Sequence, residues 1–132
     1  MKIKYASLMV EDQERALNFY TTILGFKKVA DIPVGEYRWL TVASPEGVEG
    51  IELLLEPMDF APARVYQKAL FDAGIAATSF TTNDIFTEYV HLKKLGVKFR
   101  SEPIKTEIFS TVLFEDTCGN LISLVQAENV NA

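Results

Sequence analysis

Thiols and imidazoles are almost absent from this sequence. Cys118 is the only cysteine and His91 is the only histidine. A single cysteine excludes an intrachain disulfide, and no second cysteine or histidine stands near it in the sequence to form a metal-binding pair. The two side-chain types that most often hold transition metals are therefore present once each.

Long apolar runs and clusters of basic residues are also missing. No run approaches the ~18 apolar residues that cross a bilayer, and no sustained apolar core follows the first lysines as in a secretory signal. The 13 lysines and arginines are scattered and the net charge is -5, so no basic stripe is present for a phosphate backbone. We therefore expect no membrane partner, no nucleic-acid partner and a cytoplasmic location.

The composition that remains is that of an ordinary globular protein. With 132 residues, 48% hydrophobic and 23% charged, the chain fits one domain. We expect a single domain over residues 1–132, built of a module at 1–57, a connecting helix at 58–75 and a second module at 76–128. The connecting helix is indicated by Pro62 in a first turn, Gly74 at the end, and an apolar stripe that includes Tyr66 and Leu70.

The two modules are predicted from an internal repeat. Asp12 and Asp84 occupy helix N-cap positions 72 residues apart, and Gly25 and Gly96 occupy helix ends 71 residues apart. An alternating strand precedes each helix. Strand-like segments follow at 26–31, 36–43 and 50–56 in the first half and at 97–102, 110–116 and 121–126 in the second. Each half therefore has the pattern βαβββ, with helices near 12–24 and 84–95.

Residues 50–57, GIELLLEP, show how each half-sheet divides its two faces. Period-two alternation places Ile51, Leu53 and Leu55 on one face, and Glu52 and Leu54 on the other. We expect the aliphatic face to pack against the helix of its module. The opposite faces of the two half-sheets are expected to curve around a shared cleft.

Four segments carry a family resemblance, in this order: LMVEDQERALNFYTTILGF, GIELLLEP, TTNDIFTEYVHLKKLGVKF and FEDTCGNLISLV. They closely resemble the vicinal oxygen chelate superfamily of glyoxalases, bleomycin-resistance proteins and extradiol dioxygenases, over residues 3–126. The resemblance implies an α+β fold in which two βαβββ modules form a curved mixed sheet around a cleft. A fold alone does not determine a function.

The resemblance also implies where a metal ion would be held. The implied positions lie seven residues before each capping aspartate and in the middle of each IEL-like triplet, and they are occupied here by Tyr5, Glu52, Ala77 and Ser123. A tight zinc, nickel or iron site usually needs at least two imidazole or thiolate ligands beside a carboxylate. Because these four residues supply one carboxylate, we expect no metal or other cofactor, and no glyoxalase or dioxygenase activity that depends on one.

Neither His91 nor Cys118 restores such a site. His91 lies in the second predicted helix, which covers the sheet on the side away from the cleft. Cys118 belongs to the segment DTCGN, which departs from the family's common DPDGN turn but keeps its turn-forming residues. No histidine is placed to lower the pKa of this thiol, so we interpret it as a turn residue rather than a nucleophile.

Strand parity selects the side chains that would line the cleft. The candidate ligand-binding set is Tyr5, Ser7, Tyr37, Trp39, Glu52, Leu54, Thr111 and Ser123. Aromatic faces beside a carboxylate suit a cationic or amine-bearing ligand, through cation–π contacts and a charge-assisted hydrogen bond. We therefore interpret the chain as a metal-free protein that binds or sequesters a small aromatic or amine-bearing molecule. The resemblance further implies a homodimer, and the exposed edges of curved half-sheets favour such pairing.

Two other interpretations remain open at this point. In one, Trp39 and Tyr5 fill the cleft and Glu52 forms a hydrogen bond to Tyr5 or to a strand-end amide. In the other, the chain is a lyase or isomerase that uses Glu52 as a general base or a residual metal ligand. The sequence shows no electrophilic partner for the oxyanion that proton abstraction would create. It also leaves open the ligand, the pairing of modules within or between chains, and a weak or partner-completed metal site.

Overall fold

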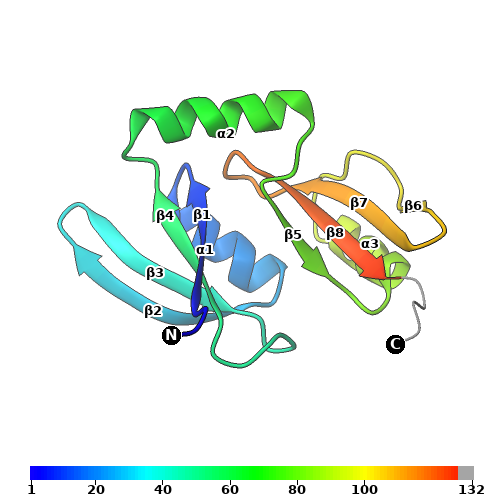
Figure 1. Cartoon of the computed structure of the whole chain (residues 1–132), viewed down its shortest axis with the longest axis horizontal. Coiled ribbons are helices and arrows are strands. Elements are labelled where there is room, and N and C mark those ends of the chain that lie inside the picture. The colour runs from blue at the N-terminus through cyan, green and yellow to red at the C-terminus, as the bar shows by residue number, and fades with distance from the viewer. Residues whose placement is uncertain (128–132) are drawn as a thin grey trace.

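The computed structural model describes residues 1–127 as two successive βαβββ units joined by a helix (Figure 1). Residue 128, the predicted end of the second module, lies outside the described residues. The first unit comprises β1 (Tyr5–Val10), α1 (Gln13–Asn18), the π-helix η1 (Phe19–Ile23), β2 (Lys27–Val34), β3 (Tyr37–Ala43) and β4 (Glu52–Pro57). The connecting helix is α2 (Ala61–Ala73). The second unit comprises β5 (Thr78–Thr81), α3 (Ile85–Lys94), β6 (Ile104–Lys105), β7 (Phe109–Glu115) and β8 (Leu121–Ala127).

Each unit forms its own four-stranded mixed sheet. The strand order is β1-β4-β3-β2 in the first sheet and β5-β8-β7-β6 in the second. In both sheets the first strand pairs in parallel with the last, and the other neighbours are antiparallel. This shared order confirms the predicted α+β fold with two βαβββ modules.

The matched helix caps are the local reason for the repeat. The Asp12 carboxylate accepts the backbone N–H of Arg15 at 2.9 Å, and the Asp84 carboxylate accepts that of Thr87 at 3.1 Å. Each bond satisfies an amide that the first helical turn leaves without a partner. Gly96, just after α3, has a φ of 92°, in the left-handed region that costs glycine little. The caps that the sequence predicted are therefore confirmed.

The predicted strand at 97–102 is wrong. The third element of the second unit is instead the two-residue strand β6, and Phe99 forms an isolated antiparallel bridge with Phe114. Pro103 directly precedes β6 and has no backbone N–H to donate to a ladder. The first unit has an eight-residue strand in the corresponding place, Lys27–Val34, so the two sheets differ most at this edge.

Two details of the predicted faces also need correction. Ile51 precedes β4 and is exposed, so the aliphatic face of that strand begins at Leu53. In α2, Tyr66 is exposed and Gln67 is the buried residue. The apolar stripe predicted for α2 was therefore wrong, because the side chain that this helix buries against the two units is the polar Gln67.

One apolar core joins the two units. It includes Leu8, Val10, Leu40, Val42 and Leu55 from the first sheet and Val112, Phe114, Ile122 and Leu124 from the second. The ring of Phe19 lies 6.3 Å from that of Phe114, and the ring of Tyr20 lies 6.3 Å from that of Phe80, between centroids. The helix-side faces of both sheets therefore meet in this core. The opposite face of each sheet, its outer face, turns away from the core. One chain therefore does not enclose the expected cleft between these opposite faces, a point that the sequence left open.

Buried polar contacts tie the same junction. The Tyr20 hydroxyl donates to Oδ2 of Asp116 at 2.6 Å. Nε2 of Gln67 lies 2.9 Å from the Met9 carbonyl and 3.1 Å from Oδ1 of Asn120. These bonds fix the turn before β8 against the end of β1 and against η1. They satisfy polar groups that are buried at the junction.

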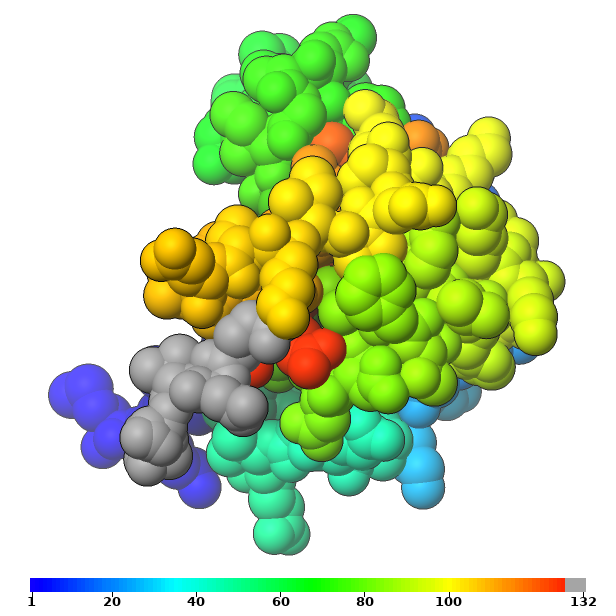
Figure 2. All heavy atoms as spheres, turned by 90° about the vertical axis from the view of Figure 1, so that its right-hand side faces the viewer, coloured from blue at the N-terminus to red at the C-terminus, as the bar shows by residue number. Residues whose placement is uncertain are grey.

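Figure 2 views the molecule from the side of the second unit. It shows α2 (green) at one end of this side, and the end of β8 (red) between the loop before β7 (yellow to orange) and the start of α3 (yellow-green). None of the helices in residues 1–127 has the length and apolar character required to cross a membrane.

Candidate functional site

Glu52, the first residue of β4, is the centre of the predicted site. Only 8% of it is exposed, and it lies opposite Tyr5 in the parallel pairing of β1 with β4. Its Oε1 accepts a hydrogen bond from the Thr41 hydroxyl at 2.6 Å, and its Oε2 lies 2.9 Å from Nζ of Lys4. The Thr41 hydrogen bond, and then the Lys4 ammonium, hold the pKa of the Glu52 carboxyl below its ordinary value. Glu52 is therefore a carboxylate at neutral pH.

The partners of Glu52 differ from those considered from the sequence. One interpretation gave it a hydrogen bond to Tyr5 or to a strand-end amide, but Thr41 and Lys4 occupy its two oxygens. Thr41 is fully buried on β3. Lys4 precedes β1 and its side chain is almost half exposed. The sequence signal for Lys4 was that it directly precedes Tyr5. Strand parity alone misses it, because parity assigns adjacent residues to opposite faces of a sheet.

An aromatic surface adjoins the carboxylate. The rings of Tyr5 and Trp39 meet edge to face, with centroids 5.4 Å apart and an interplanar angle of 83°. Tyr5 is 45% exposed, Trp39 38% and Tyr37 36%. Tyr37 donates its hydroxyl to Asp59 at 2.9 Å. Tyr5 and Trp39 therefore expose their rings beside a buried negative charge, and Tyr37 extends this surface at the other end of β3.

Lys4 already makes the two contacts that a cationic ligand would make there. Its ammonium is paired with Glu52 and lies 5.5 Å from the centroid of the Tyr5 ring. Both contacts attract a positive charge, the first by ion pairing and the second through the ring quadrupole. The chain therefore neutralises its own candidate site with a lysine.

Ser7 and Leu54 extend this surface along the same strands. They lie opposite one another in the β1–β4 pairing, and Leu54 also lies opposite Thr41. Leu54 is buried whereas Ser7 is exposed. The structure thus brings six predicted residues together on the outer face of the first sheet: Tyr5, Ser7, Tyr37, Trp39, Glu52 and Leu54.

Thr111 and Ser123 lie on the second sheet and are bonded to each other. Their hydroxyl oxygens are 3.1 Å apart. Thr111 is opposite Val125, two residues beyond Ser123, just as Thr41 is opposite Leu54, two residues beyond Glu52. The two pairs are therefore equivalent in the repeat. Because the outer faces of the two sheets turn away from the shared core, one chain does not bring Thr111 and Ser123 to Glu52.

Glu52 also borders a cavity of about 260 Å³ between the two units. Apolar side chains of both units form most of its lining, among them Phe26, Val42, Leu53 and Phe80. Ser79 of the second unit borders the same cavity, so the structure brings this residue near Glu52.

The four positions implied for metal binding do not fit a metal ion. Glu52 is committed to Lys4 and Thr41, and Ser123 to Thr111. In the β5–β8 pairing, Ser123 lies opposite Ser79 rather than Ala77. Neither serine nor alanine supplies a strong ligand. Within residues 1–127, no three histidine, cysteine, aspartate or glutamate side chains gather as a potential metal site.

The single histidine and cysteine stay outside this surface. His91 lies in α3 and is exposed. Cys118 is fully buried, and burial raises the pKa of its thiol. Its backbone N–H donates to Asp116 at 2.8 Å in the turn before β8. Burial keeps this thiol protonated, as expected of a turn residue and not of a nucleophile.

Comparison with known proteins gives one family. The model of the Glyoxalase/Bleomycin resistance protein/Dioxygenase superfamily matches residues 2–124. The uncharacterized protein YurT of Bacillus subtilis (strain 168) is 49% identical over 126 residues, which cover 96% of this chain and 99% of YurT. Among solved structures, UcmS2 has a TM-score of 0.80 at 28% identity, covering 95% of this chain and 97% of its own. TnmS3, an antibiotic binding protein from Streptomyces sp. CB03234, has a TM-score of 0.73 at 27% identity, covering 97% of each chain.

Proposed function

Since this chain belongs to the Glyoxalase/Bleomycin resistance protein/Dioxygenase superfamily, we propose that it binds a small molecule without a metal ion, and that the ligand joins an aromatic group to a cationic amine. It would sequester this ligand rather than transform it. The site would be the outer face of the first sheet around Glu52.

The observation that carries this proposal is an ionised, largely buried carboxylate beside exposed aromatic rings. Glu52 is held as a carboxylate, and Tyr5 and Trp39 expose more than a third of their surface next to it. Large aromatic side chains are seldom left exposed in a cluster unless another molecule covers them. A positive charge near Glu52 and an apolar group on the rings would use both features.

The position of Lys4 supports a cationic ligand. Lys4 precedes the first strand and is partly exposed, so its side chain can leave Glu52 without disturbing the sheet. A ligand ammonium that replaced it would take over the contacts with Glu52 and Tyr5. Lys4 would then act as a competitor that keeps weakly bound cations out.

The relatives support a binding role for the fold. TnmS3, at 27% identity over nearly the whole chain, is an antibiotic binding protein. A ligand with both a ring and an amine is consistent with that class of compound. The ligand of TnmS3 is not thereby the ligand of this chain, because the specificity depends on the residues of each site.

A second copy of the chain would complete the site. The first sheet's outer face carries the exposed aromatic rings, and the second sheet's outer face carries Thr111 and Ser123. The two faces cannot meet within one chain because the sheets share a core on their other side. A homodimer that placed the second sheet of one copy over the first sheet of the other would bury the rings and supply hydroxyl groups to the ligand.

The enzymatic alternative with Glu52 as a general base is less well supported. An efficient base at neutral pH needs a raised pKa, whereas Thr41 and Lys4 lower the pKa of Glu52. Thr41 and Lys4, the two groups beside Glu52 that could stabilise a developing oxyanion, both contact the carboxylate itself. Binding is therefore the function that this geometry favours.

Trp39 allows a direct test because it is the only tryptophan in the chain. Benzylamine, which is cationic at pH 7, should change Trp39 fluorescence in a saturable way, and benzyl alcohol of similar shape should bind much more weakly. Glu52→Gln should weaken benzylamine binding about tenfold or more, as expected for a hydrogen bond to a charged group. Lys4→Met should strengthen it about two- to fivefold, because an exposed competing ion pair is removed.

A matched control uses the equivalent position of the other sheet. Ser123→Ala should leave benzylamine binding to a monomer unchanged and should weaken it only where two copies associate, which size-exclusion chromatography with light scattering would measure. Equal affinity for benzylamine and benzyl alcohol, or an unchanged affinity in Glu52→Gln, would contradict the proposal.

A further inference from the structure

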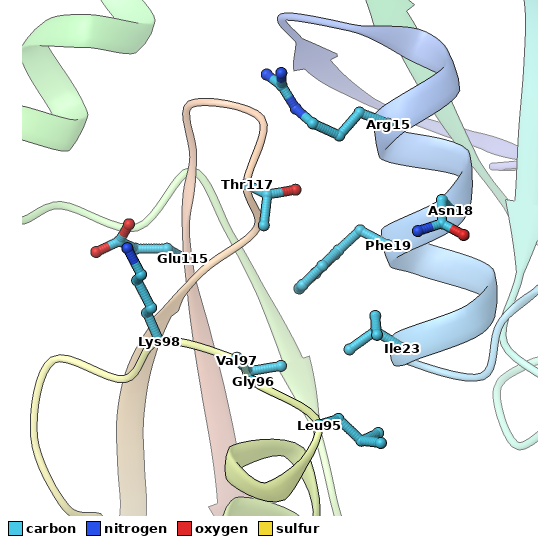
Figure 3. Close-up of a pocket in the computed structure, with 10 residues that line it drawn as sticks. All are labelled: Arg15, Asn18, Phe19, Ile23, Leu95, Gly96, Val97, Lys98, Glu115 and Thr117. Atoms are coloured by element: carbon cyan, nitrogen blue, oxygen red, sulfur yellow. The ribbon is translucent and has the colours of Figure 1, made fainter.

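A second cavity, of about 420 Å³, lies on the helix side of the molecule (Figure 3). It opens between α1 and η1 of the first unit and the segment that follows α3 in the second unit, with Glu115 and Thr117 completing its wall. Its volume falls in the range of roughly 300–1,000 Å³ typical of small-molecule sites. It shares no lining residue with the surface around Glu52.

The cavity has an apolar floor and one apolar end. Phe19 points into its middle in Figure 3, and both Phe19 and Val97 are buried. Ile23 and Leu95 lie at the end away from Arg15. Leu95 is exposed, so part of this apolar end is open to a ligand. A ring or a short aliphatic chain would gain free energy by covering these side chains.

Basic side chains stand at the opposite end and on the facing wall. Arg15, on α1, lies at the end away from Ile23 and Leu95, and Lys98 lies with Glu115 on the wall facing α1 (Figure 3). Glu115, the acidic lining residue, is paired with Arg100 through a contact of 3.4 Å. Arg15 contacts the Glu11 carboxylate only at 3.9 Å, which is at the limit of an ion pair. A local excess of positive charge in a chain of net charge -5 favours an anion. The fork of a guanidinium suits a carboxylate, sulfonate or phosphate group.

The backbone around the cavity is unusual on both sides. The π-helix η1 contributes Phe19 and Ile23, with the N–H of Leu24 donating to the Phe19 carbonyl at 3.0 Å. Thr117, on the opposite wall, has a backbone φ of 67°, which residues other than glycine seldom adopt. π-Helical turns and strained residues occur more often at functional sites than elsewhere. Both features border this cavity.

We propose that this cavity is a second ligand site, for a small amphiphilic anion that carries one aromatic ring or a short aliphatic chain. The anionic group lies between Arg15 and Lys98, and the apolar part covers Phe19, Ile23 and Leu95. The site is independent of the one proposed around Glu52, since its charge preference is opposite and its residues are different.

Amide NMR of the uniformly ¹⁵N-labelled protein, titrated with sodium benzoate, tests this site. Benzoate should shift the amide signals of Gly96, Val97 and Thr117 in a saturable way and leave the Trp39 indole signal unmoved. Arg15→Gln and Lys98→Gln should each weaken benzoate binding about threefold or more, the effect of losing one partly exposed charged contact. Lys94→Gln, an exposed lysine of α3 that does not line the cavity, is the matched control and should bind benzoate as the parent does.

Benzylamine separates this site from the first one, because it has the same ring with the opposite charge. It should leave the signals of Gly96, Val97 and Thr117 unmoved even where it changes Trp39 fluorescence. Benzoate shifts centred on Trp39, equal shifts of Gly96 by both compounds, an equal loss in Lys94→Gln, or no saturable shift up to the solubility of benzoate would each overturn the proposal.

Discussion

The two βαβββ units share a core pattern and differ in the chemistry of their outer faces. Towards the core, aliphatic side chains of β4 and β8 occupy equivalent positions, as Leu53 and Leu124 do. On the outer faces, the first unit has a carboxylate, Glu52, and the second has a hydroxyl, Ser123. A mutation on the core side must preserve packing, whereas one on the outer side is limited only by what covers it. Function therefore has most freedom to diverge on the outer faces.

The threonine of each sheet shows how local this divergence is. Thr41 donates to Glu52 at 2.6 Å, and Thr111 lies 3.1 Å from the oxygen of Ser123. The threonine hydroxyl is common to both units, but its partner is a carboxylate in the first unit and a hydroxyl in the second. The pair of aromatic rings Tyr5 and Trp39 adjoins the carboxylate of the first unit. One change of residue type at the equivalent position thus separates an anionic site from a neutral one.

The largest expected effect comes from removing the contact that holds the two units together. Gln67→Leu should lower the free energy of unfolding by about 3 kcal/mol, since it removes the hydrogen bonds of Gln67 to the Met9 and Cys118 carbonyls and leaves the buried Oδ1 of Asn120 without this donor. Denaturant unfolding measures this, and Tyr66→Leu, next to it on the exposed side of α2, should change the value by less than about 0.5 kcal/mol. Two separate transitions in the parent chain would show instead that the units are independent.

A second substitution at the junction should lower the unfolding free energy somewhat less. Tyr20→Phe removes the hydroxyl that donates to Asp116 and should cost about 2 kcal/mol of unfolding free energy. Burial raises the pKa of Tyr20 well above its ordinary value of 10.0. Above that ordinary value the unfolded chain loses the tyrosine proton while the folded chain keeps it, so the parent should lose stability as the pH rises. Unfolding measured from pH 9 to 11 should show a weaker decline in Tyr20→Phe, and an identical decline in both proteins would contradict this cause.

The comparison between the sheets is tested by matched threonine variants. Thr41→Val should lower the unfolding free energy by about 1.5 kcal/mol, because it removes a hydrogen bond to a buried carboxylate. Thr111→Val should cost about 0.5 kcal/mol or less, because Ser123 is partly exposed and can bind water instead. Equal costs for the two variants, by denaturant unfolding at pH 7, would mean that the charge of Glu52 has no structural consequence.

The smallest effect concerns the acid side of the stability curve. Because the folded-state pKa of Glu52 is lowered, its contribution to stability is present above the ordinary glutamate pKa and is lost as the pH falls through the folded value. Glu52→Gln should therefore flatten part of the stability loss below about pH 5. Ser123→Ala should leave the acid limb unchanged, and the comparison is made by thermal unfolding from pH 3 to 7.

Short-range patterns in the sequence determined the plan of each unit. The capping aspartates and the glycines that follow the helices fixed where helices start and end, because a cap acts within a few residues. Alternation along residues 50–57 correctly separated Leu53 and Leu55 from Glu52 and Leu54. The repeat then predicted the same element pattern, βαβββ, for the second unit as for the first.

Side chains that connect distant segments could not be predicted in the same way. Gln13 donates to the carbonyls of Arg38 and Leu55 at 2.7 and 3.0 Å, and Gln67 bridges β1 and the turn before β8. Both glutamines look like surface residues in the sequence, because their partners are backbone groups more than 20 residues away. Lys4 was missed for the same reason, since its partner Glu52 is brought near it only by strand pairing.

The sequence by itself determined two βαβββ units, the helix-side face of each sheet, and a carboxylate without metal-binding companions at Glu52. The tertiary structure decided that the helix-side faces meet in one core and that the outer faces point apart, with Glu52 on one and Ser123 on the other. Periodicity assigns a side chain to a face of its own strand, but it carries no information on the orientation of one sheet relative to another. That orientation depends on which apolar surfaces bury each other. Here the first unit packs on the second through contacts such as that of Phe19 with Phe114.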